Sequence, residues 1–327
     1  MQEVAWNTLD EQEYFMTSAS DIDAGTVISQ QPQSLSMFDF FLYGTTVFAW
    51  GFSWYALKLQ AVITPEIALF WRFLFATFLM WGWAKLGGHK LLFPLRAHLS
   101  FAALGLLLFS TNFLLFYHGS RELPSGLLSV VFSLASVFNI VLGFVLFRQK
   151  VSRALVVGAV LGFSGICLMF YQEIAGSTWN LAALGGLGLC ALGTLSFCFG
   201  NIVSARATAQ KISVISASAW GMVYGTVLLG ANGLMQGASF DVPFTPEFIW
   251  SFLYMVVIGS IVAFGAYLTL LGRIGSARAG YATVMFPIVA LGVSTAMEGY
   301  TWTITSILGL LFALGGNWIV LSRSAKK

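Results

Sequence analysis

Long apolar runs recur along this chain from Phe38 to Leu321, separated by short polar segments. A helix needs roughly 20 mainly apolar residues to cross a bilayer core about 30 Å thick. The runs therefore predict ten spans, near residues 40–59, 65–84, 98–119, 124–147, 153–171, 182–204, 213–235, 248–271, 277–297 and 303–321. The alternation of a lumen-facing barrel strand is missing, so the pattern indicates an all-α membrane protein.

The first 37 residues follow a different pattern. They hold six acidic residues, no Lys or Arg, and no apolar run long enough for the core of a signal peptide. We expect residues 1–37 to form a disordered acidic cytoplasmic tail, and residues 324–327 to form a short basic cytoplasmic C-terminus.

Composition excludes a soluble domain and charge placement orients the spans. The chain is 58% hydrophobic and 9% charged, with a mean hydropathy of +0.83, whereas soluble domains carry roughly 25% charged residues. With the tail inside, most Lys and Arg residues fall in inner loops, and the acidic residues beyond the tail fall in outer loops, Asp39 apart. Because Lys and Arg mark cytoplasmic loops, we expect a multi-pass protein of the plasma (inner) membrane with both termini in the cytoplasm.

Matching residues recur at a nearly constant distance along the chain. Gly158 and Gly165 match Gly309 and Gly316 at an offset of 151, and Trp71 matches Trp220 at an offset of 149. Two copies of five helices follow, at residues 38–175 and 178–323. An odd number of spans forces the second copy to enter the membrane upside down. Inverted repeats of this kind occur in secondary transporters, whose substrate site lies near the midplane between the repeats.

The chain also resembles a known family in particular segments. These are Ala49-Trp50-Gly51-Phe52-Ser53-Trp54 with Lys58, Thr64-Pro65 followed by Trp71-Arg72-Phe73, Gly126 to Leu134, Met285-Phe286-Pro287, and Glu298-Gly299. They resemble the drug/metabolite transporter superfamily, in its ten-helix group built from two EamA-type repeats. The chain departs from that pattern at Ser133, where the family often has Pro, and at Gln149, where Glu is frequent. The resemblance implies two inverted five-helix EamA repeats and the export of amino acids or other small metabolites.

Arg72 is the first candidate for a substrate-binding residue. A charge inside a span costs about 2.5–3.5 kcal/mol on insertion scales and normally faces the bundle or a wet cavity. One interpretation is a structural ion pair or cap, with Glu298 or Glu66 as partner, and the other is contact with a substrate carboxylate. With Arg72 as the main cation within the spans, a highly anionic substrate is not expected, because phosphate groups are bound by several Lys or Arg residues.

Aromatic and polar side chains supply the other candidates. Trp50 and Trp54 are four residues apart, hence on one face of a helix, and they either pack against neighbours or line a cavity for an apolar or cationic solute. His118 either hydrogen-bonds a neighbour or carries a proton. The remaining substrate-binding candidates are Asn112, Tyr117, Trp220, Tyr267 and Tyr281. We assign structural or gating roles, as hypotheses, to Gly126, Gly280, Pro287 and Glu298.

The sequence lacks the motifs that are typical of other classes of protein. The three His residues are scattered, and His89 and His98 are expected to be solvated in an inner loop, so neither an enzyme nor a metal site is predicted. The three Cys residues lie in apolar runs, and there is no GxxxxGK[ST] phosphate loop.

We expect no cofactor and no nucleic acid, but a small-molecule substrate and the lipid bilayer as partners. The sequence thus predicts a secondary transporter, an exporter by alternating access. An uptake or exchange carrier for a neutral or aromatic solute, or a membrane scaffold, is the alternative.

Overall fold

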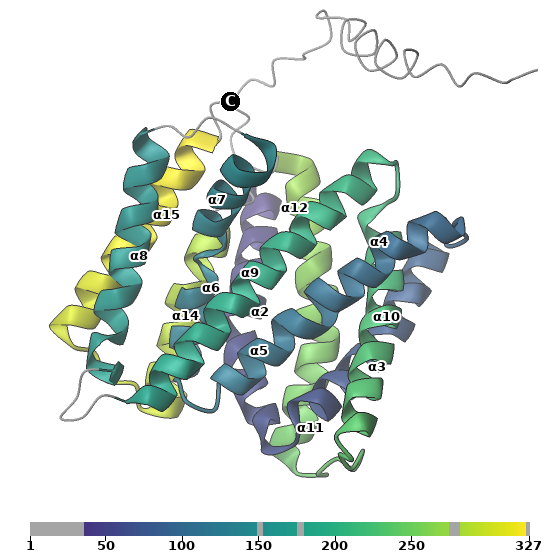
Figure 1. Ribbon diagram of the computed structural model, residues 1–327, viewed down its shortest axis with the longest axis horizontal. Coiled ribbons are helices and arrows are strands. Elements are labelled where there is room, and N and C mark those ends of the chain that lie inside the picture. The colour runs from purple at the N-terminus through teal and green to yellow at the C-terminus, as the bar shows by residue number, and fades with distance from the viewer. Residues whose placement is uncertain (1–35, 149–152, 175–179, 275–281, 325–327) are drawn as a thin grey trace, which may run out of the picture. The chain divides into compact units, whose positions relative to one another are not determined.

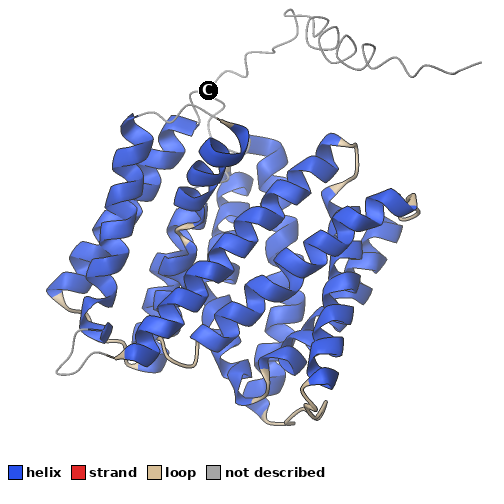
Figure 2. Ribbon diagram, in the orientation of Figure 1, coloured by secondary structure: helices blue, strands red, loops and turns tan. Residues whose placement is uncertain are grey.

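The computed structural model describes residues 36–148, 153–174, 180–274 and 282–324, and every regular element in these ranges is helical (Figure 1, Figure 2). The elements are α2 (Met37–Leu59), η1 (Gln60–Val62), α3 (Pro65–Leu86), α4 (Leu95–Leu106), η2 (Leu107–Thr111), α5 (Asn112–Gly119), α6 (Ser125–Phe132), α7 (Ala135–Phe147), α8 (Arg153–Ile174), α9 (Leu181–Ala209), α10 (Val214–Met235), α11 (Pro246–Leu253), η3 (Tyr254–Val262), α12 (Ala263–Ile274), α14 (Ala282–Glu298) and α15 (Ile304–Ser324). The predicted tail lies outside the described residues except for Ser36 and Met37, and Met37 already belongs to α2.

The predicted all-helical membrane fold is confirmed. Each of the ten predicted spans coincides with one helix or with consecutive helices of the described chain, and residues 277–281 of the ninth span lie outside the described residues. Among the residues that the structure describes, six helical segments are long and apolar enough to cross a membrane, and three shorter apolar helices accompany them. We call the side that holds residues 60–64, 120–124, 236–245 and 299–303 the outer end, after the predicted topology. The side that holds residues 87–94 and 210–213 is the inner end.

The helix pair α8 and α15 lies side by side at one edge of the described bundle (Figure 1). A Cβ atom on Gly165 would lie 2.4 Å from the backbone N of Ala313, and one on Gly316 would lie 2.5 Å from the backbone N of Gly162. An offset of 151 converts the first contact into the second. Small residues let helix backbones approach closely in membranes, so the repeated glycines serve one symmetric contact between the two halves.

Two tryptophans make matching hydrogen bonds at opposite ends of the bundle. Trp71 Nε1 donates to the carbonyl oxygen of Phe240 at the outer end, over 3.1 Å. Trp220 Nε1 donates to the carbonyl oxygen of Leu91 at the inner end, over 2.9 Å. Donor and acceptor are both shifted by 149, from 71 to 220 and from 91 to 240. Each half therefore anchors a loop of the other half in the same way, upside down.

The third and eighth predicted spans each contain a π-helical segment, η2 and η3. Ser110 Oγ donates to the carbonyl oxygen of Gly105 over 3.0 Å, and Ser260 Oγ donates to that of Met255 over 2.8 Å. An offset of 150 relates the two bonds. Such wide turns are found mostly at functional sites and at bends of helices, so both repeats carry the same local irregularity.

The fourth and ninth spans differ from each other. α6 ends at Phe132 and α7 starts at Ala135, and Ser133 Oγ donates to the carbonyl oxygen of Val130 over 2.6 Å. Ser hydroxyls that bond back to the preceding turn compete with the helical ladder. In the other repeat, Pro287 lies inside the continuous helix α14. The break in the fourth span thus occurs where this chain has Ser and the family pattern has Pro.

Candidate functional site

Four aromatic rings from four helices form a cluster. Three of the helices belong to the first repeat and the fourth is α14. The Trp54 ring on α2 lies 5.1 Å from Phe116 on α5, 5.6 Å from Phe132 on α6 and 6.2 Å from Phe286 on α14, measured between ring centroids. We call these four residues the aromatic box. Aromatic rings present apolar faces with a negative quadrupole, which suit apolar, aromatic or cationic groups. Because Phe286 belongs to the second repeat, the box joins the two repeats.

Trp50 lies one helical turn before Trp54 on α2 and faces another helix. Its ring centroid lies 5.1 Å from that of Tyr267 on α12. Nearby, the hydroxyl of Tyr254 donates to the carbonyl oxygen of Ala49 over 2.9 Å. The structure therefore brings the predicted residues Trp50 and Tyr267 together, on the side of α2 that meets the eighth span.

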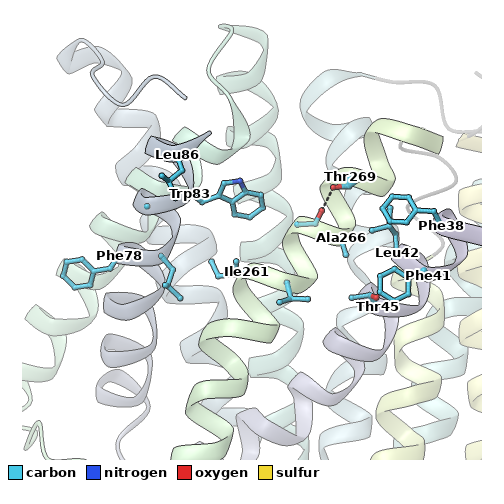
Figure 3. A pocket seen from close by; sticks show the side chains of 14 residues that line it. Phe38, Phe41, Leu42, Thr45, Phe78, Trp83, Leu86, Ile261, Ala266 and Thr269 are labelled. Carbon is cyan, nitrogen blue, oxygen red and sulfur yellow. Dashed lines mark hydrogen bonds between the residues drawn. The ribbon is translucent and has the colours of Figure 1, made fainter. Parts of the chain in front are cut away.

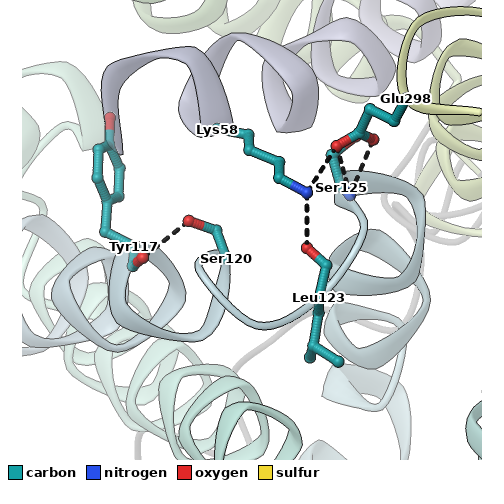
Figure 4. Close-up of polar contacts among 6 residues, drawn as sticks. All are labelled: Lys58, Tyr117, Ser120, Leu123, Ser125 and Glu298. Atoms are coloured by element: carbon teal, nitrogen blue, oxygen red, sulfur yellow. Dashed lines mark hydrogen bonds and ion pairs between the residues drawn. The ribbon is translucent and has the colours of Figure 1, made fainter. Parts of the chain in front are cut away.

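At the outer end of the bundle, a polar network links the three helices α2, α6 and α14 (Figure 4). Lys58 Nζ on α2 lies 2.9 Å from Glu298 Oε1 on α14 and 3.2 Å from the carbonyl oxygen of Leu123. The backbone N–H of Ser125 donates to Glu298 Oε2 over 3.0 Å, and the Ser125 hydroxyl donates to the same oxygen. Since Ser125 is the first residue of α6, the carboxylate also meets a helix N-terminus, which favours negative charge. We call Lys58, Leu123, Ser125 and Glu298 the outer closure.

Arg72 is buried, with 5% of its surface exposed. Its guanidinium lies over the rings of Phe113 and Phe73, at 4.6 and 5.1 Å from their centroids. Among the described residues, no hydrogen-bond partner reaches its Nε or Nη1. Burying an unpaired charged donor costs at least about 1–3 kcal/mol, so an added acceptor that bonds these two nitrogens would be stabilised.

Of the interpretations of Arg72, an ion pair with Glu298 or Glu66 is absent from the described residues, because both carboxylates bind elsewhere. Glu298 pairs with Lys58. Glu66 Oε1 lies 3.5 Å from His118 Nε2 and accepts a hydrogen bond from the Gln236 side chain over 3.2 Å. Glu66 is itself buried in the first turn of α3, which explains how His118 on α5 acquires an acidic partner.

Tyr117 and Asn112 lie near the same outer half of the third span. The Tyr117 hydroxyl donates to Gln60 Oε1 over 2.8 Å, and its side chain lies beside Arg72. Asn112 is buried, and within the described chain no partner reaches its Oδ1. Arg72, Asn112 and Gln60 thus combine buried, unpartnered donors and acceptors in one half of the bundle.

Trp220 lies apart from the aromatic box. Its ring packs against Trp81 and His98, with centroids at 5.0 and 4.5 Å, and its N–H bonds Leu91 at the inner end. His98 was expected to be solvated, but it belongs to α4, is half-buried and hydrogen-bonds Tyr224 over 3.0 Å. The Trp220 cluster therefore joins helices, and nothing places it beside the other candidate residues.

Of the four gating candidates, Gly126, Pro287 and Glu298 lie at the contact between the fourth and ninth spans. A Cβ atom on Gly126 would lie 2.9 Å from the Cα of Leu291 on α14. Pro287 lies one residue beyond the box residue Phe286. Gly280 and Tyr281 fall outside the described residues. No three His, Cys, Asp or Glu side chains of the described ranges gather as metal ligands would.

Comparison with known proteins decides the family. The EamA-like transporter family matches residues 38–171 and 184–322, which together cover most of the chain. The chain belongs to the EamA-like transporter family. This makes it a multi-pass membrane transporter for a small molecule, and not an enzyme, as the sequence predicts.

Individual relatives agree with this family membership. The chain is 27% identical to the inner membrane transporter YedA of Escherichia coli K12 over 255 residues, which cover 77% of this chain and 80% of YedA. It is 23% identical to a probable amino-acid metabolite efflux pump of Salmonella typhimurium LT2, over 60% of this chain and 67% of the pump. A solved crystal structure matches the fold with a TM-score of 0.63 at 12% identity, over 88% of this chain and 99% of the other.

Several residues around the candidate site of this transporter were given no binding or gating role from the sequence. Phe116, Phe132 and Phe286 are three of thirty phenylalanines, and nothing in their spacing marks them as neighbours of Trp54. Lys58 and Ser125 also gained their significance only from the contact with Glu298. A usable signal did exist: both Lys58 and Glu298 end an apolar run at the same predicted side of the membrane.

Proposed function

We propose that this transporter exports amino acids or other small organic metabolites from the cytoplasm by alternating access, with both termini in the cytoplasm. The observation that carries this proposal is the pair of matching hydrogen bonds of Trp71 and Trp220 at opposite ends of the bundle. Two inverted halves that are joined by equivalent contacts can adopt two conformations, and the symmetry of the repeat relates one conformation to the other. Exchange between them exposes a midplane site to one side and then to the other.

In this proposal the substrate binds between the aromatic box and Arg72. Trp54 provides apolar contact for a side chain or ring, and Trp50, packed on Tyr267 one helical turn away, extends this aromatic surface. Arg72 provides unpartnered N–H donors for a carboxylate, which is a strong, charge-assisted acceptor. Tyr117 and Asn112 extend the polar part of the site. The similarity to the Salmonella protein, named a probable amino-acid metabolite efflux pump, supports a zwitterionic cargo.

The aromatic box also favours a second candidate function, the uptake or exchange of a neutral aromatic solute. Such a solute would use Trp54 and its Phe neighbours without needing Arg72. The two candidates therefore differ in their dependence on the guanidinium, which a single transport experiment resolves.

The test is counterflow of a labelled panel of amino acids, amines and aromatic solutes into proteoliposomes. We expect Trp54→Ala to reduce transport at least about tenfold, since truncating an aromatic anchor in a buried site costs 2 kcal/mol or more. We expect Arg72→Gln to reduce transport of carboxylate-bearing solutes by a similar factor and to spare the amines.

Matched controls use the same residue types away from the site. Trp318→Ala changes an exposed tryptophan on α15, and Arg121→Gln changes an exposed arginine at the outer end. Both should transport like the unmodified protein. If no member of the panel moves, the proposed cargo is wrong. Transport rates that do not change when a pH gradient is imposed would exclude His118 as a proton carrier.

A further inference from the structure

An apolar groove of about 730 Å³ opens on the side of the bundle in its inner half (Figure 3). α2 and α3 form its two walls, and η3 with α12 forms its floor. The hydroxyl of Thr269 on the floor donates to the carbonyl oxygen of Gly265 over 2.8 Å. That bond satisfies the hydroxyl inside the helix and leaves the groove an apolar surface.

The groove runs along the helices for about the depth of one leaflet. Its α3 wall extends from Phe78 to Leu86, which at 1.5 Å per residue is about 12 Å. Half of a bilayer core about 30 Å thick is about 15 Å. Phe78 is 68% exposed and Leu86 is 90% exposed, so these wall residues face the lipid phase. The groove thus has the length and the polarity of a slot for an acyl chain.

Small residues create this space, and the repeat-related position in the other leaflet is filled. Gly82 on the α3 wall has no atom within 4 Å of its missing Cβ, and Ala266 forms part of the floor. The offset of 150 that relates the two π-helical segments takes Ala266 to Phe116, which is buried within the aromatic box. The groove is therefore specific to the inner half of the bundle and not a consequence of the repeat.

Basic residues lie at the inner mouth of the groove. Lys85 is exposed next to Leu86 and forms no ion pair within the described residues. Arg273 lies one turn beyond Thr269 on α12, with its guanidinium 5.2 Å from the ring centroid of Phe38, a residue of the groove. Arg273 also pairs with Asp39. The two basic residues Lys85 and Arg273 outnumber the single acidic residue Asp39, so the mouth carries net positive charge.

We propose that this groove binds an anionic phospholipid of the inner leaflet, with an acyl chain between α2 and α3 and the phosphate beside Lys85 and Arg273. Basic sites between membrane helices at the cytoplasmic side bind anionic headgroups, and each Lys or Arg near the surface contributes about 1 kcal/mol. The bound chain would lie against Ile261 and Val262 of η3, the π-helical part of the eighth span. This site is independent of the cargo and of the direction of transport.

The test is native mass spectrometry of the purified, full-length protein titrated with phosphatidylglycerol or phosphatidylcholine of identical acyl chains. We expect one phosphatidylglycerol to bind at least about fivefold more tightly than phosphatidylcholine. Lys85→Gln should weaken phosphatidylglycerol binding about fivefold, the factor that corresponds to one basic residue, and leave phosphatidylcholine binding unchanged. Gly82→Leu should remove the tight site for both lipids, because its side chain would occupy the groove.

Gly44→Leu is the matched control, since Gly44 on α2 lies outside the groove and also has open space around its missing Cβ. It should bind phosphatidylglycerol like the unmodified protein. Equal affinity of the unmodified protein for the two lipids overturns the proposal, as does full binding by Gly82→Leu. A dimer without lipid adducts would assign the groove to a second copy instead. If Gly82→Leu does not fold, the exposed Lys85→Gln variant decides alone: an unchanged lipid preference refutes the site.

Discussion

The outer and inner ends of this transporter are held by ion pairs that the repeat does not relate, and the inner pair is Asp39 with Arg273. At the outer end, Lys58 and Glu298 join α2 to α14 in a partly buried ion pair. The offset of 149 takes Glu298 back to Gln149 in the first repeat, and nearly the same offset takes Lys58 to Arg206, which is exposed. Gln149 has no charge to pair with Arg206. The repeat-related ion pair is therefore ruled out by the sequence of the inner end.

Packing contacts do not share this difference. The glycines of α8 and α15 and the two tryptophan hydrogen bonds are the same in both halves. Symmetric packing serves both arrangements of an alternating-access transporter equally, whereas a contact made at one end stabilises only the arrangement in which that end is closed. We infer that packing provides the two states and that the outer closure favours one of them.

The largest expected effect tests the symmetric packing. Gly165→Leu would drive a side chain into the backbone of α15, where even the Cβ atom has only 2.4 Å to Ala313 N. Overpacking costs about 1–3 kcal/mol in ordinary cores, and more where the obstacle is backbone. We expect a loss of more than about 3 kcal/mol, measured as thermal stability in detergent, and an equal loss for Gly316→Leu.

Gly315→Leu is the control for this prediction, because no atom lies within 4 Å of the missing Cβ of Gly315, on the same helix. Its stability should stay close to that of the unmodified protein. If Gly165→Leu and Gly315→Leu melt alike, the close approach of α8 and α15 is not the contact that we describe.

A smaller effect is expected at the outer closure. Lys58→Gln removes the charge that faces Glu298 but leaves the Ser125 bonds in place. Because the Lys58 side chain is 35% exposed, we expect a cost of about 1 kcal/mol, which shifts the population with an open outer end about fivefold. A cysteine at Ser129, buried one turn inside Ser125, should then react about fivefold faster with an impermeant maleimide added outside.

This measurement needs a background without Cys167, Cys190 and Cys198. Arg273→Gln serves as the control, because it breaks the ion pair with Asp39 in the inner half. That variant should not accelerate labelling from outside. Unchanged labelling in Lys58→Gln would show that the outer closure does not hold this end shut.

The sequence predicted the fold well because its signals are local. Apolar runs of about 20 residues and the glycines repeated at a distance of 151 can be recognised in the linear sequence without knowledge of the fold. The candidate site was harder to predict, since it depends on contacts between distant segments. Trp54 meets Phe286 across the repeat boundary, and Glu66 binds His118 instead of Arg72. Hydropathy places both Glu66 and Glu298 in loops and does not show which side chain each of them binds.

The smallest expected effect concerns the tryptophan hydrogen bonds, and it tests the symmetry most directly. Trp71→Phe and Trp220→Phe each keep a ring but lose the N–H donor to a backbone carbonyl. One hydrogen bond contributes about 0.5–1.5 kcal/mol to stability, and the orphaned carbonyls of Phe240 and Leu91 lie near the two bundle ends. We expect both variants to lose about 0.5 kcal/mol in thermal unfolding, at the low end of that range because water can reach the bundle ends, with Trp250→Phe, a half-exposed tryptophan, as the unaffected control. Because matched contacts stabilise both transport states alike, neither variant should change the labelling of the cysteine at Ser129. A labelling change in one variant alone would mean that the two bonds belong to different states, and that the halves are not equivalent.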